Sequence, residues 1–256
     1  MKIKKILGVD IGGSGIKGAI INTKTGEMLT PRFRIETPSP ATPKDVADTV
    51  NRLAKHYAWN GSIGCGFPAV IKEGVAKTAA NIDKSFIDTD VNALFSNITG
   101  CPVFCVNDAD AAGIAEMKYG AGRNAYGVVI LVTVGTGIGT VIFSKGKLMP
   151  NTELGHVILP NLQEAELYAS DAVRKNQKMP WEEWAKRFNE YLLYMEQLFW
   201  PDAFIIGGGV SKDPKVFMPY LTVKSKVVPA ILQNNAGMIG AAIYARQMLK
   251  AIYPVD

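Results

Sequence analysis

The stretch ILGVDIGGSGIKGAI, residues 6–20, decides the fold. A short apolar run ends at Asp10, and several glycines follow. Gly13, Gly15 and Gly18 fit the G-x-G-x-x-G spacing of a dinucleotide site, but such a site needs a helix directly after the glycines, because the pyrophosphate binds at the helix N-terminus. Here a second β-like run and a turn at Gly26 occupy that place. The sequence therefore predicts strand, glycine turn and strand, and argues against a dinucleotide fold.

A second stretch of the same kind, VVILVTVGTGIGTVIFSKGKLM, spans residues 128–149. It again predicts an apolar strand, a glycine turn, an apolar strand and a hairpin. The glycines echo the opening ones at an offset of about 122: Gly135, Gly137 and Gly139 stand for Gly13, Gly15 and Gly18. The match is short and lacks the aspartate, so chance similarity stays an alternative. Two such units in one chain predict a duplicated α/β architecture with a cleft between the halves.

Helix and strand signals fill the rest of the chain. Thr42 and Pro43 are typical of a helix start, and apolar residues at helical spacing extend that helix to about residue 58. Further helices are expected over residues 109–122, 181–199 and 236–252, and further strands in IGCGFPAVI (63–71), CPVFCVND (101–108) and PDAFIIGGG (201–209).

The totals are those of a globular chain, with 48% hydrophobic and 20% charged residues among 256. No apolar run is long enough to span a bilayer, and no signal-type segment follows the basic start, so we expect a cytoplasmic protein without a membrane partner. The three cysteines are expected to be buried and reduced, and two histidines are too few for a histidine-rich metal site. The net charge of +5 fits ordinary surface lysines or, as the alternative, a polyanionic partner; we expect no nucleic acid.

Three strands run into small, flexible residues, at positions 12–15, 135–139 and 207–209. Glycine lets backbone amides approach a ligand closely, and repeated amide donors suit a chain of phosphates. Asp10 would repel phosphates unless a hydrated Mg²⁺ stood between them, or else it caps its own turn. Lys17 either reaches a phosphate oxygen or is solvated.

Asp108 ends a strand and opens a helix. It is either a helix N-cap or the general base that phosphoryl transfer to a hydroxyl requires. Glu153 and His156 lie in the loop PNTELGH after the second hairpin. They either face solvent or bind vicinal hydroxyls of a polyol, whose buried oxygens need hydrogen-bond partners.

Five motifs in order resemble the sugar kinases of the ROK family: VDIGGSGIKGA, VNDADAAG, VGTGIGTVIF, PNTELGH and PDAFIIGGGVSK. The resemblance extends from about Leu7 to about Tyr244. It is closest to the polyphosphate glucokinase branch, which uses inorganic polyphosphate, often with ATP as an alternative donor. The five motifs are specific for the family, and the choice of branch within it is a separate prediction.

The resemblance implies the two-lobed, actin-like sugar-kinase ATPase fold, with duplicated ribonuclease H-like sheet domains and a cleft. We expect lobes at residues 1–107 and 108–237, with a final helix over 238–256 packing on the first. Implied roles are Asp108 as catalytic base and sugar ligand, and Asp10 as the Mg²⁺ ligand, directly or through water. The implied sugar ligands are Asn107, Glu153, His156 and Glu166. The implied phosphate or nucleotide contacts are Gly12, Gly13, Ser14, Gly15, Lys17, Thr136, Gly137, Gly139, Gly208 and Gly209.

Three departures from the family pattern carry information. Many ROK proteins hold zinc through cysteines after the E-x-G-H motif, but no cysteine follows Cys105 here, so we expect no zinc and His156 is free to bind sugar. The segment around Glu166 departs from the usual spacing. ROK repressors carry a helix-turn-helix before the kinase-like part, for which a strand beginning near Ile6 leaves no room.

The expected function is a homodimeric glucokinase that makes glucose 6-phosphate from polyphosphate or ATP. The alternatives are an ATP-dependent kinase for mannose, fructose or N-acetylmannosamine, and a sugar sensor without turnover. Candidate lysines for a polyphosphate track beside the cleft are Lys145, Lys147, Lys212, Lys215, Lys224 and Lys226.

Overall fold

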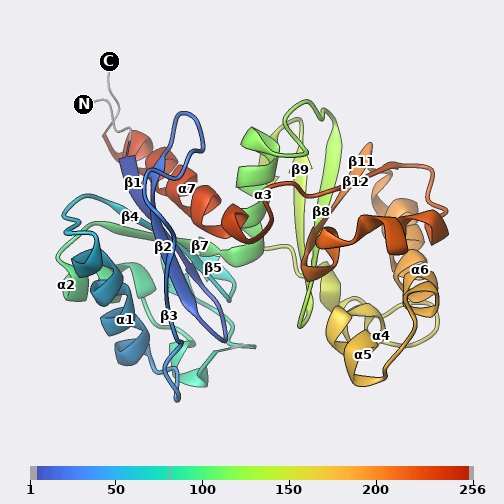
Figure 1. The fold of residues 1–256 in the computed structure, drawn as a ribbon, viewed down its shortest axis with the longest axis horizontal. Coiled ribbons are helices and arrows are strands. Elements are labelled where there is room, and N and C mark those ends of the chain that lie inside the picture. The colour runs from blue at the N-terminus through green and yellow to red at the C-terminus, as the bar shows by residue number, and fades with distance from the viewer. Residues whose placement is uncertain (1–4, 81, 254–256) are drawn as a thin grey trace. The chain divides into compact units, whose positions relative to one another are not determined.

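Strand β1 (Lys5–Ile11) is the central strand of the first sheet in the computed structural model, which describes residues 5–80 and 82–253 (Figure 1). The sheet has the order β3-β2-β1-β4-β7. Strands β2 and β3 are antiparallel to their neighbours, whereas β1, β4 and β7 run parallel. The bounds are β2 Ile16–Asn22, β3 Phe33–Ile35, β4 Ile63–Phe67 and β7 Val103–Asn107, with a small hairpin of β5 Ile71–Lys72 and β6 Val75–Ala76.

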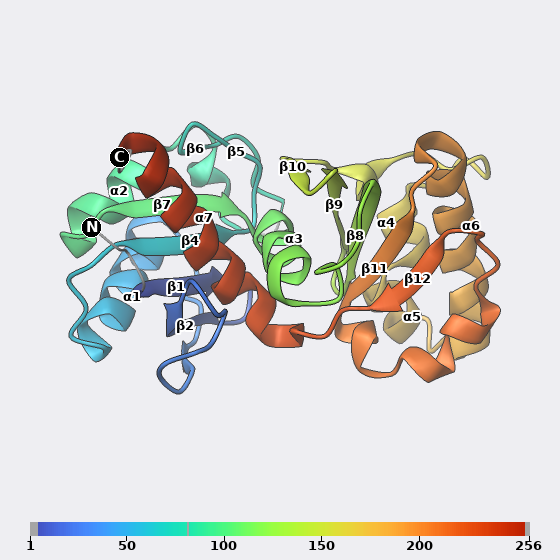
Figure 2. The ribbon, with the colours of Figure 1, turned by 90° about the horizontal axis from the view of Figure 1, so that it is seen from above.

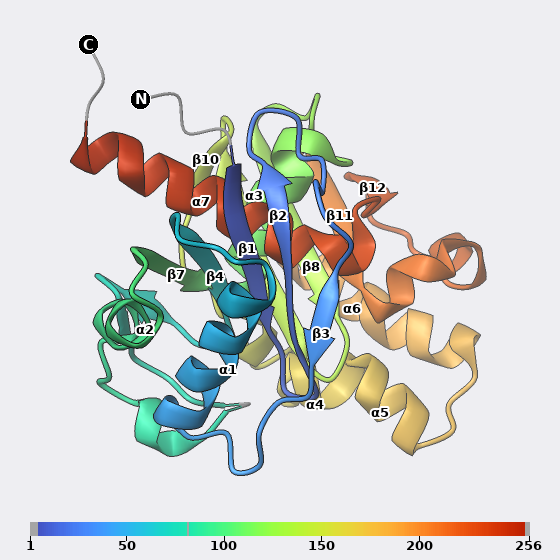
Figure 3. The same ribbon diagram turned by 60° about the vertical axis from the view of Figure 1, so that its left-hand side comes forward.

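Helices cover both faces of this sheet. Helices α1 (Pro43–His56) and α2 (Val91–Thr99) pack on one face, as Figure 3 shows, and share an apolar core with the odd-numbered residues of β1. Helix α7 (Ala236–Ile252) crosses β1, β4 and β7 on the other face (Figure 2). Glycine is required there, because a Cβ at Gly8 or Gly64 would overlap backbone atoms of α7.

The second sheet repeats the order of the first as β10-β9-β8-β11-β12. Strands β8, β9 and β10 are antiparallel neighbours, and β8, β11 and β12 run parallel. The bounds are β8 Val128–Val134, β9 Ile138–Ser144, β10 Lys147–Met149, β11 Ala203–Gly208 and β12 Lys226–Pro229. The duplicated architecture expected from the two glycine stretches is therefore confirmed.

Helix α6 (Trp181–Phe199) supplies the core of the second unit. Its buried stripe includes Trp184, Phe188 and Leu192, which pack on the even-numbered residues of β8. The short helices α4 (Ala165–Ala169) and α5 (Asp171–Asn176) precede it. The expected strands and helices are thus present, although the segment after β2 forms a strand only over Phe33–Ile35.

The chain changes units inside α3 (Asp108–Tyr119). Contacts group residues 1–115 and 235–256 into the first unit and residues 116–234 into the second. We expected the boundary at residue 107, before this helix. It lies later because the start of α3 packs against α7, where a Cβ at Gly240 would overlap the backbone of Ala111. None of the helices within the described residues has the length and apolar character to cross a membrane.

Candidate active site

The first glycine turn, residues 12–15, joins β1 to β2. Gly12 O accepts a hydrogen bond from the Thr37 hydroxyl at 2.5 Å, and Ser14 O accepts one from the Arg34 guanidinium. Within residues 5–80 and 82–253, the amides of Gly13 and Ser14 have no acceptor in the protein. The turn is therefore held through its carbonyl oxygens, while two of its amides stay available to an anion.

Asp10 occupies the carboxyl end of β1, with 19% of its side chain exposed. Lys17 lies opposite it in the β1–β2 register and places Nζ 3.3 Å from Oδ2. In the first turn of α7, a Cβ at Gly237 would approach the Asp10 carboxylate to 2.9 Å. A helix N-terminus favours negative charge, so Asp10 faces both a cation and a helix start.

Asp10 and Asp108 come together around a third residue, Gly66 of β4. A Cβ at Gly66 would lie 3.8 Å from Asp10 Oδ1 and 3.7 Å from the Asp108 Cα. Both acids thus lie at the carboxyl ends of β1 and β7, the parallel strands on either side of β4, which is where ligands bind in open α/β sheets. Both also belong to the first unit, whereas we expected them in different lobes.

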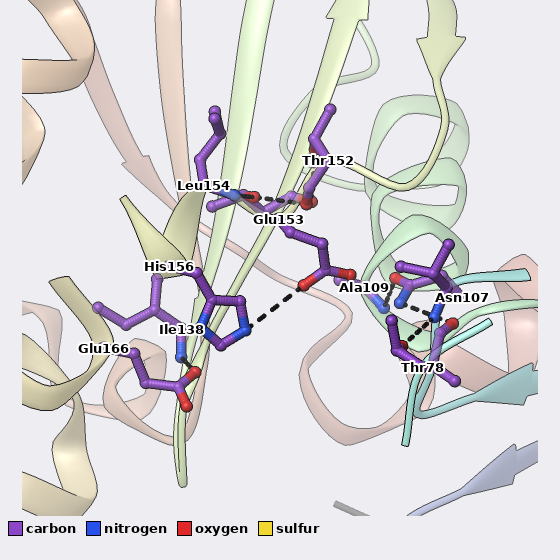
Figure 4. Close-up of polar contacts among 12 residues, drawn as sticks. Thr78, Asn107, Ala109, Ile138, Thr152, Glu153, Leu154, His156 and Glu166 are labelled. Atoms are coloured by element: carbon purple, nitrogen blue, oxygen red, sulfur yellow. Dashed lines mark hydrogen bonds and ion pairs between the residues drawn. The ribbon is translucent and has the colours of Figure 1, made fainter. Parts of the chain in front are cut away.

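Asn107, rather than Asp108, caps helix α3. The Asn107 side-chain oxygen accepts from the amides of Ala109 at 2.9 Å and Asp110 at 3.1 Å, and its Nδ2 donates to Ala69 O at 3.2 Å (Figure 4). Asp108 is half-buried, and its Oδ1 accepts from the Ala109 amide at 2.8 Å. The cap prediction for Asp108 was one residue too late, because both residue types cap helices well.

The second glycine turn, residues 135–137, joins β8 to β9. Its amides at Thr136 and Gly137 have no protein acceptor among the described residues. Glu166 supports the turn from outside, since its Oε2 accepts from the Ile138 amide at 2.8 Å (Figure 4). A Cβ at Gly137 would overlap that same oxygen. Gly139 lies beyond the turn, within β9.

The third glycine turn follows β11. Gly208 has a φ of 78°, and a Cβ there would overlap the backbone of Val134, so only glycine fits. Ser211 Oγ donates to Gly208 O at 2.8 Å and closes the turn. Both Gly208 and Gly209 are exposed at the carboxyl edge of the second sheet.

The six lysines proposed as a track do not lie together. Lys212 and Lys215 follow Gly209 in short 3-10 turns. The other four lie at the opposite edge of the sheet, where β8, β11 and β12 begin: Lys145, Lys147, Lys224 and Lys226. The prediction of one track beside the glycine turns was therefore wrong for those four. Parallel strands have their amino ends on one side of the sheet and their carboxyl ends on the other, and the charge pattern does not show at which end a lysine lies.

Glu153 and His156 belong to a segment that is tied to β9. Thr152 Oγ1 donates to Thr140 O at 2.8 Å, and the Leu154 amide donates to Thr140 Oγ1 at 2.9 Å (Figure 4). His156 Nε2 lies 3.9 Å from Glu153 Oε2. The two side chains suggested by the sequence are therefore neighbours in the structure.

His156 has a second acid partner, Glu164. The distance from His156 Nδ1 to Glu164 Oε1 is 2.5 Å. This hydrogen bond raises the pKa of His156 above its ordinary value, and the charges of Glu166 and Glu153 add to the effect. Burial raises the pKa of the Glu153 carboxyl, while the nearby His156 opposes that shift. A raised histidine pKa beside three acids favours the imidazolium, with Nε2–H available as a donor.

Sequence reasoning missed three residues of these sites. Arg34 lies opposite Lys17 in the β2–β3 register, which no local motif shows. Gly66 separates the two acids, and its only signal was a glycine inside a strand. Glu164 lies two residues before Glu166, in the segment whose spacing departs from the family pattern.

A metal ligand set is not obvious from side chains alone. Among residues 5–80 and 82–253, no three His, Cys, Asp or Glu side chains form a group that could hold a metal ion. Mg²⁺ commonly binds through one or two carboxylates, water and substrate phosphates, so it does not need such a group. Asp10, at the open first turn, fits that mode of binding.

Comparison with known proteins gives consistent relatives. The model of the ROK family matches residues 6–178. The chain is 44% identical over 237 residues to a polyphosphate glucokinase of Mycobacterium tuberculosis (strain CDC 1551 / Oshkosh), covering 92% of this chain and 89% of the relative. Two solved structures are similar. The inorganic polyphosphate/ATP-glucomannokinase from Arthrobacter sp. strain KM has a TM-score of 0.91 at 42% identity, over 95% of this chain and 99% of that one. A ROK family glucokinase from Streptomyces griseus, in complex with glucose and AMPPNP, has a TM-score of 0.80 at 26% identity, over the same shares.

Proposed function

The chain belongs to the ROK family, and from that premise we propose that it is a hexokinase-type phosphotransferase: a glucokinase that transfers a phosphoryl group from inorganic polyphosphate or ATP to the 6-hydroxyl of glucose. The observation that carries this proposal is the convergence of Asp10 and Asp108 around Gly66, next to a turn with open amides. Asp10 is thereby available to act on the phosphoryl donor, and Asp108 to act on the sugar hydroxyl.

Asp108 is the proposed general base. It lies half-buried at the first residue of α3, and its Oδ1 is fixed by the Ala109 amide. A carboxylate in this position accepts the proton of the 6-hydroxyl as the oxygen attacks the terminal phosphorus. The bond from that phosphorus to the bridging oxygen breaks, and ADP, or polyphosphate shortened by one phosphate, leaves. Phosphoryl transfer needs little covalent help beyond this base, alignment and neutralisation of charge.

The glycine turns are the proposed phosphate contacts. Open amides at Gly13 and Ser14, and at Thr136 and Gly137, donate to phosphate oxygens without side-chain reorganisation. Lys17 adds a positive charge at the first turn, and Gly208 and Gly209 line the part of the second unit that follows β11. Gly12, Gly15 and, beyond the second turn, Gly139 are the remaining proposed phosphate contacts of the first two turns.

Asp10 is the proposed holder of Mg²⁺, directly or through water. When bound, the ion neutralises phosphate charge and aligns the donor. Asp10 fits this role because its carboxylate is partly exposed and because Lys17 contacts only one of its two oxygens, Oδ2.

Each proposed sugar ligand keeps a polar atom beyond its contacts within the protein. Asn107 retains one amide hydrogen beyond its contact with Ala69, and His156 retains Nε2 beyond its contact with Glu164. Glu153 offers a half-exposed carboxylate, and Glu166 has Oε1 besides the oxygen that holds the second turn. Donors and acceptors that a bound sugar would cover in this way reject sugars that lack the matching hydroxyl.

Mannose is the second candidate substrate, because the Arthrobacter relative is named a glucomannokinase. The Mycobacterium and Arthrobacter relatives, at 44% and 42% identity, are not named for fructose, N-acetylmannosamine or sensing. A cytoplasmic location belongs to the proposal, since the cysteines at 65, 101 and 105 are all buried and free, as in proteins of reducing compartments. So does a homodimer, which light scattering would test.

One assay matrix tests the proposal. Glucose and mannose are each supplied with ATP or long-chain polyphosphate, with and without Mg²⁺, and the sugar phosphate is measured directly. We expect product from glucose with at least one donor, and only with Mg²⁺ present. A purified, folded protein that phosphorylates no hexose with either donor would refute the enzyme and leave the sensor.

A further inference from the structure

A buried ion-pair cluster lies beside the second and third glycine turns. Asp171, the first residue of α5, is 4% exposed and contacts two cations. Arg174 Nε lies 2.8 Å from its Oδ1, and Lys175 Nζ lies 2.7 Å from its Oδ2. The three residues together carry one net positive charge. None of them was singled out from the sequence.

The cluster is fastened to both turns. The amide of Ala172 donates to Gly135 O at 3.0 Å, which joins α5 to the second turn. A Cβ at Gly209 would lie 3.9 Å from Asp171 Oδ2, the oxygen that holds Lys175. Asp171 Oδ2 thus contacts the Lys175 ammonium and also lies near the third turn.

The two cations differ in what they leave free. The Arg174 guanidinium stacks over the Trp181 ring at 3.8 Å, and only 16% of its side chain is exposed, so it is part of the packing. The Lys175 side chain is 65% exposed. An ammonium has three donors, and Asp171 occupies one of them. Lys175 thus presents directed, solvent-facing positive charge next to a row of glycines.

We propose that Lys175 binds phosphate groups of the polyphosphate donor where the chain passes Gly208 and Gly209, with Asp171 as the positioning residue that holds the ammonium there. This inference rests on the proposed function and adds a subsite to it. The amides of the turns bind the phosphates nearest the transferred group. Lys175 binds groups farther along the chain, which a linear polyphosphate has and ATP lacks.

The test compares Lys175→Gln with Lys186→Gln. Lys186 is a matched control, since it pairs with Glu182 at 2.8 Å, also four residues apart, and is 64% exposed on α6. For Lys175→Gln we expect the KM for polyphosphate to rise about tenfold, as the loss of one charge-assisted hydrogen bond implies. The KM for ATP should rise less. The dependence of the polyphosphate KM on salt should also become shallower, because the variant has one fewer lysine to displace counterions from the bound polyphosphate. Lys175→Arg should restore much of the affinity.

Asp171→Asn tests the positioning role. It should raise the KM for polyphosphate more than it lowers kcat, and with Lys175→Gln in place it should add little to that KM. If this variant fails to fold, the exposed Lys175 variants still decide the question. A Lys175→Gln variant whose polyphosphate KM matches that of Lys186→Gln, or whose ATP KM rises equally, overturns the inference. A wild-type protein that uses ATP but not polyphosphate also overturns it, while the kinase assignment stands.

Discussion

The first and second glycine turns each join two antiparallel strands of a five-stranded sheet. They differ in the charged side chains that lie next to them. The pair Ile11–Ile16 closes the first turn, and Val134–Ile138 closes the second. In this register Asp10 corresponds to Thr133, and Lys17 to Gly139. The charged pair of the first unit therefore has no counterpart in the second.

The acids near the glycine turns of the second unit come from other segments of the chain. Glu166 reaches the Ile138 amide from α4, and Asp171 lies near Gly209 from α5. The first turn keeps Asp10 on the strand itself, where Asp108 joins it from the strand two places along the sheet. Both turns keep amides without a protein acceptor among the described residues, but their acids differ: Asp10 and Asp108 lie close together in the first unit, whereas Glu166 holds the second turn through the Ile138 amide.

The largest effect is expected for Asp108→Asn. We expect kcat to fall by about 10²- to 10⁴-fold, the usual contribution of a general base. The amide keeps the shape of the side chain and an oxygen for the Ala109 amide, so glucose binding measured by calorimetry should persist. Asp48→Asn, at an exposed ion pair on α1, is the control. A kcat within tenfold of wild type would count against Asp108 as base.

A second variant pair compares the corresponding strand positions directly. Asp10→Asn should lower kcat about 10²-fold and weaken the dependence on Mg²⁺, since it removes charge placed for the transition state. Thr133→Val, at the matching position of β8, should leave kcat near the wild-type value. Steady-state kinetics at several Mg²⁺ concentrations measure both. Equal losses in the two variants would show that the units do not differ as described.

The glycines of the two turns should respond unequally to a methyl group. A Cβ at Gly137 overlaps Glu166 Oε2, which is hydrogen-bonded to Ile138, so Gly137→Ala should lower the free energy of unfolding by about 1–3 kcal/mol. A Cβ at Gly12 lies 3.2 Å from Gly15 O, and Gly12→Ala should cost less. Urea unfolding followed by tryptophan fluorescence measures both. Adding Glu166→Ala should relieve the Gly137→Ala loss; strict additivity would contradict the overlap.

The smallest effect concerns the pair formed by His156 and Glu164. Glu164→Gln should lower the pKa of His156, because it removes the hydrogen bond that chiefly raises it. With a raised pKa in the fold, the pair stabilises the protein below the ordinary histidine pKa and loses this contribution as pH rises through the raised value. Glu164→Gln should therefore destabilise the protein more in acid than in alkaline solution.

Proton NMR of the imidazoles measures this shift directly. The chain has two histidines, and His56, which stacks on Phe33, supplies the reference signal. An unchanged titration of His156 in Glu164→Gln would mean that Glu153 and Glu166, not Glu164, set its protonation.

Long periodic segments of this fold could be predicted from the sequence. Helix α6 was placed to the residue, because its apolar stripe is long and ends at a turn signal. The final helix, α7, agrees with the range 236–252 expected from the sequence pattern and not with the range 238–256 expected from the family resemblance, whose last three residues lie outside the described part of the chain. The internal repeat was also visible. The offset of about 122 matched Gly18 with Gly139, whereas the register matches Gly18 with Thr140, because the second turn is one residue shorter.

The rest depended on contacts between distant segments. Nothing local shows that Gly237 covers Asp10, or that Gly66 separates two acids, since each requires the register of parallel strands. Glu164 and Glu166 are two residues apart, and composition cannot say which one reaches His156. Only the fold distributes them, one to the imidazole and one to the Ile138 amide.

The position of helix α7 at the end of the sequence affects the order in which the two units can fold during translation. It covers the sheet built from residues 5–107, and its Gly237 lies against Asp10, yet it is translated after the whole second unit. A nascent chain can therefore finish residues 116–234 while the first sheet still lacks its cover. The surroundings of Asp10 are completed only when residues 236–252 leave the ribosome, so a chain stalled before them can hold a folded second unit while Asp10 still lacks its cover.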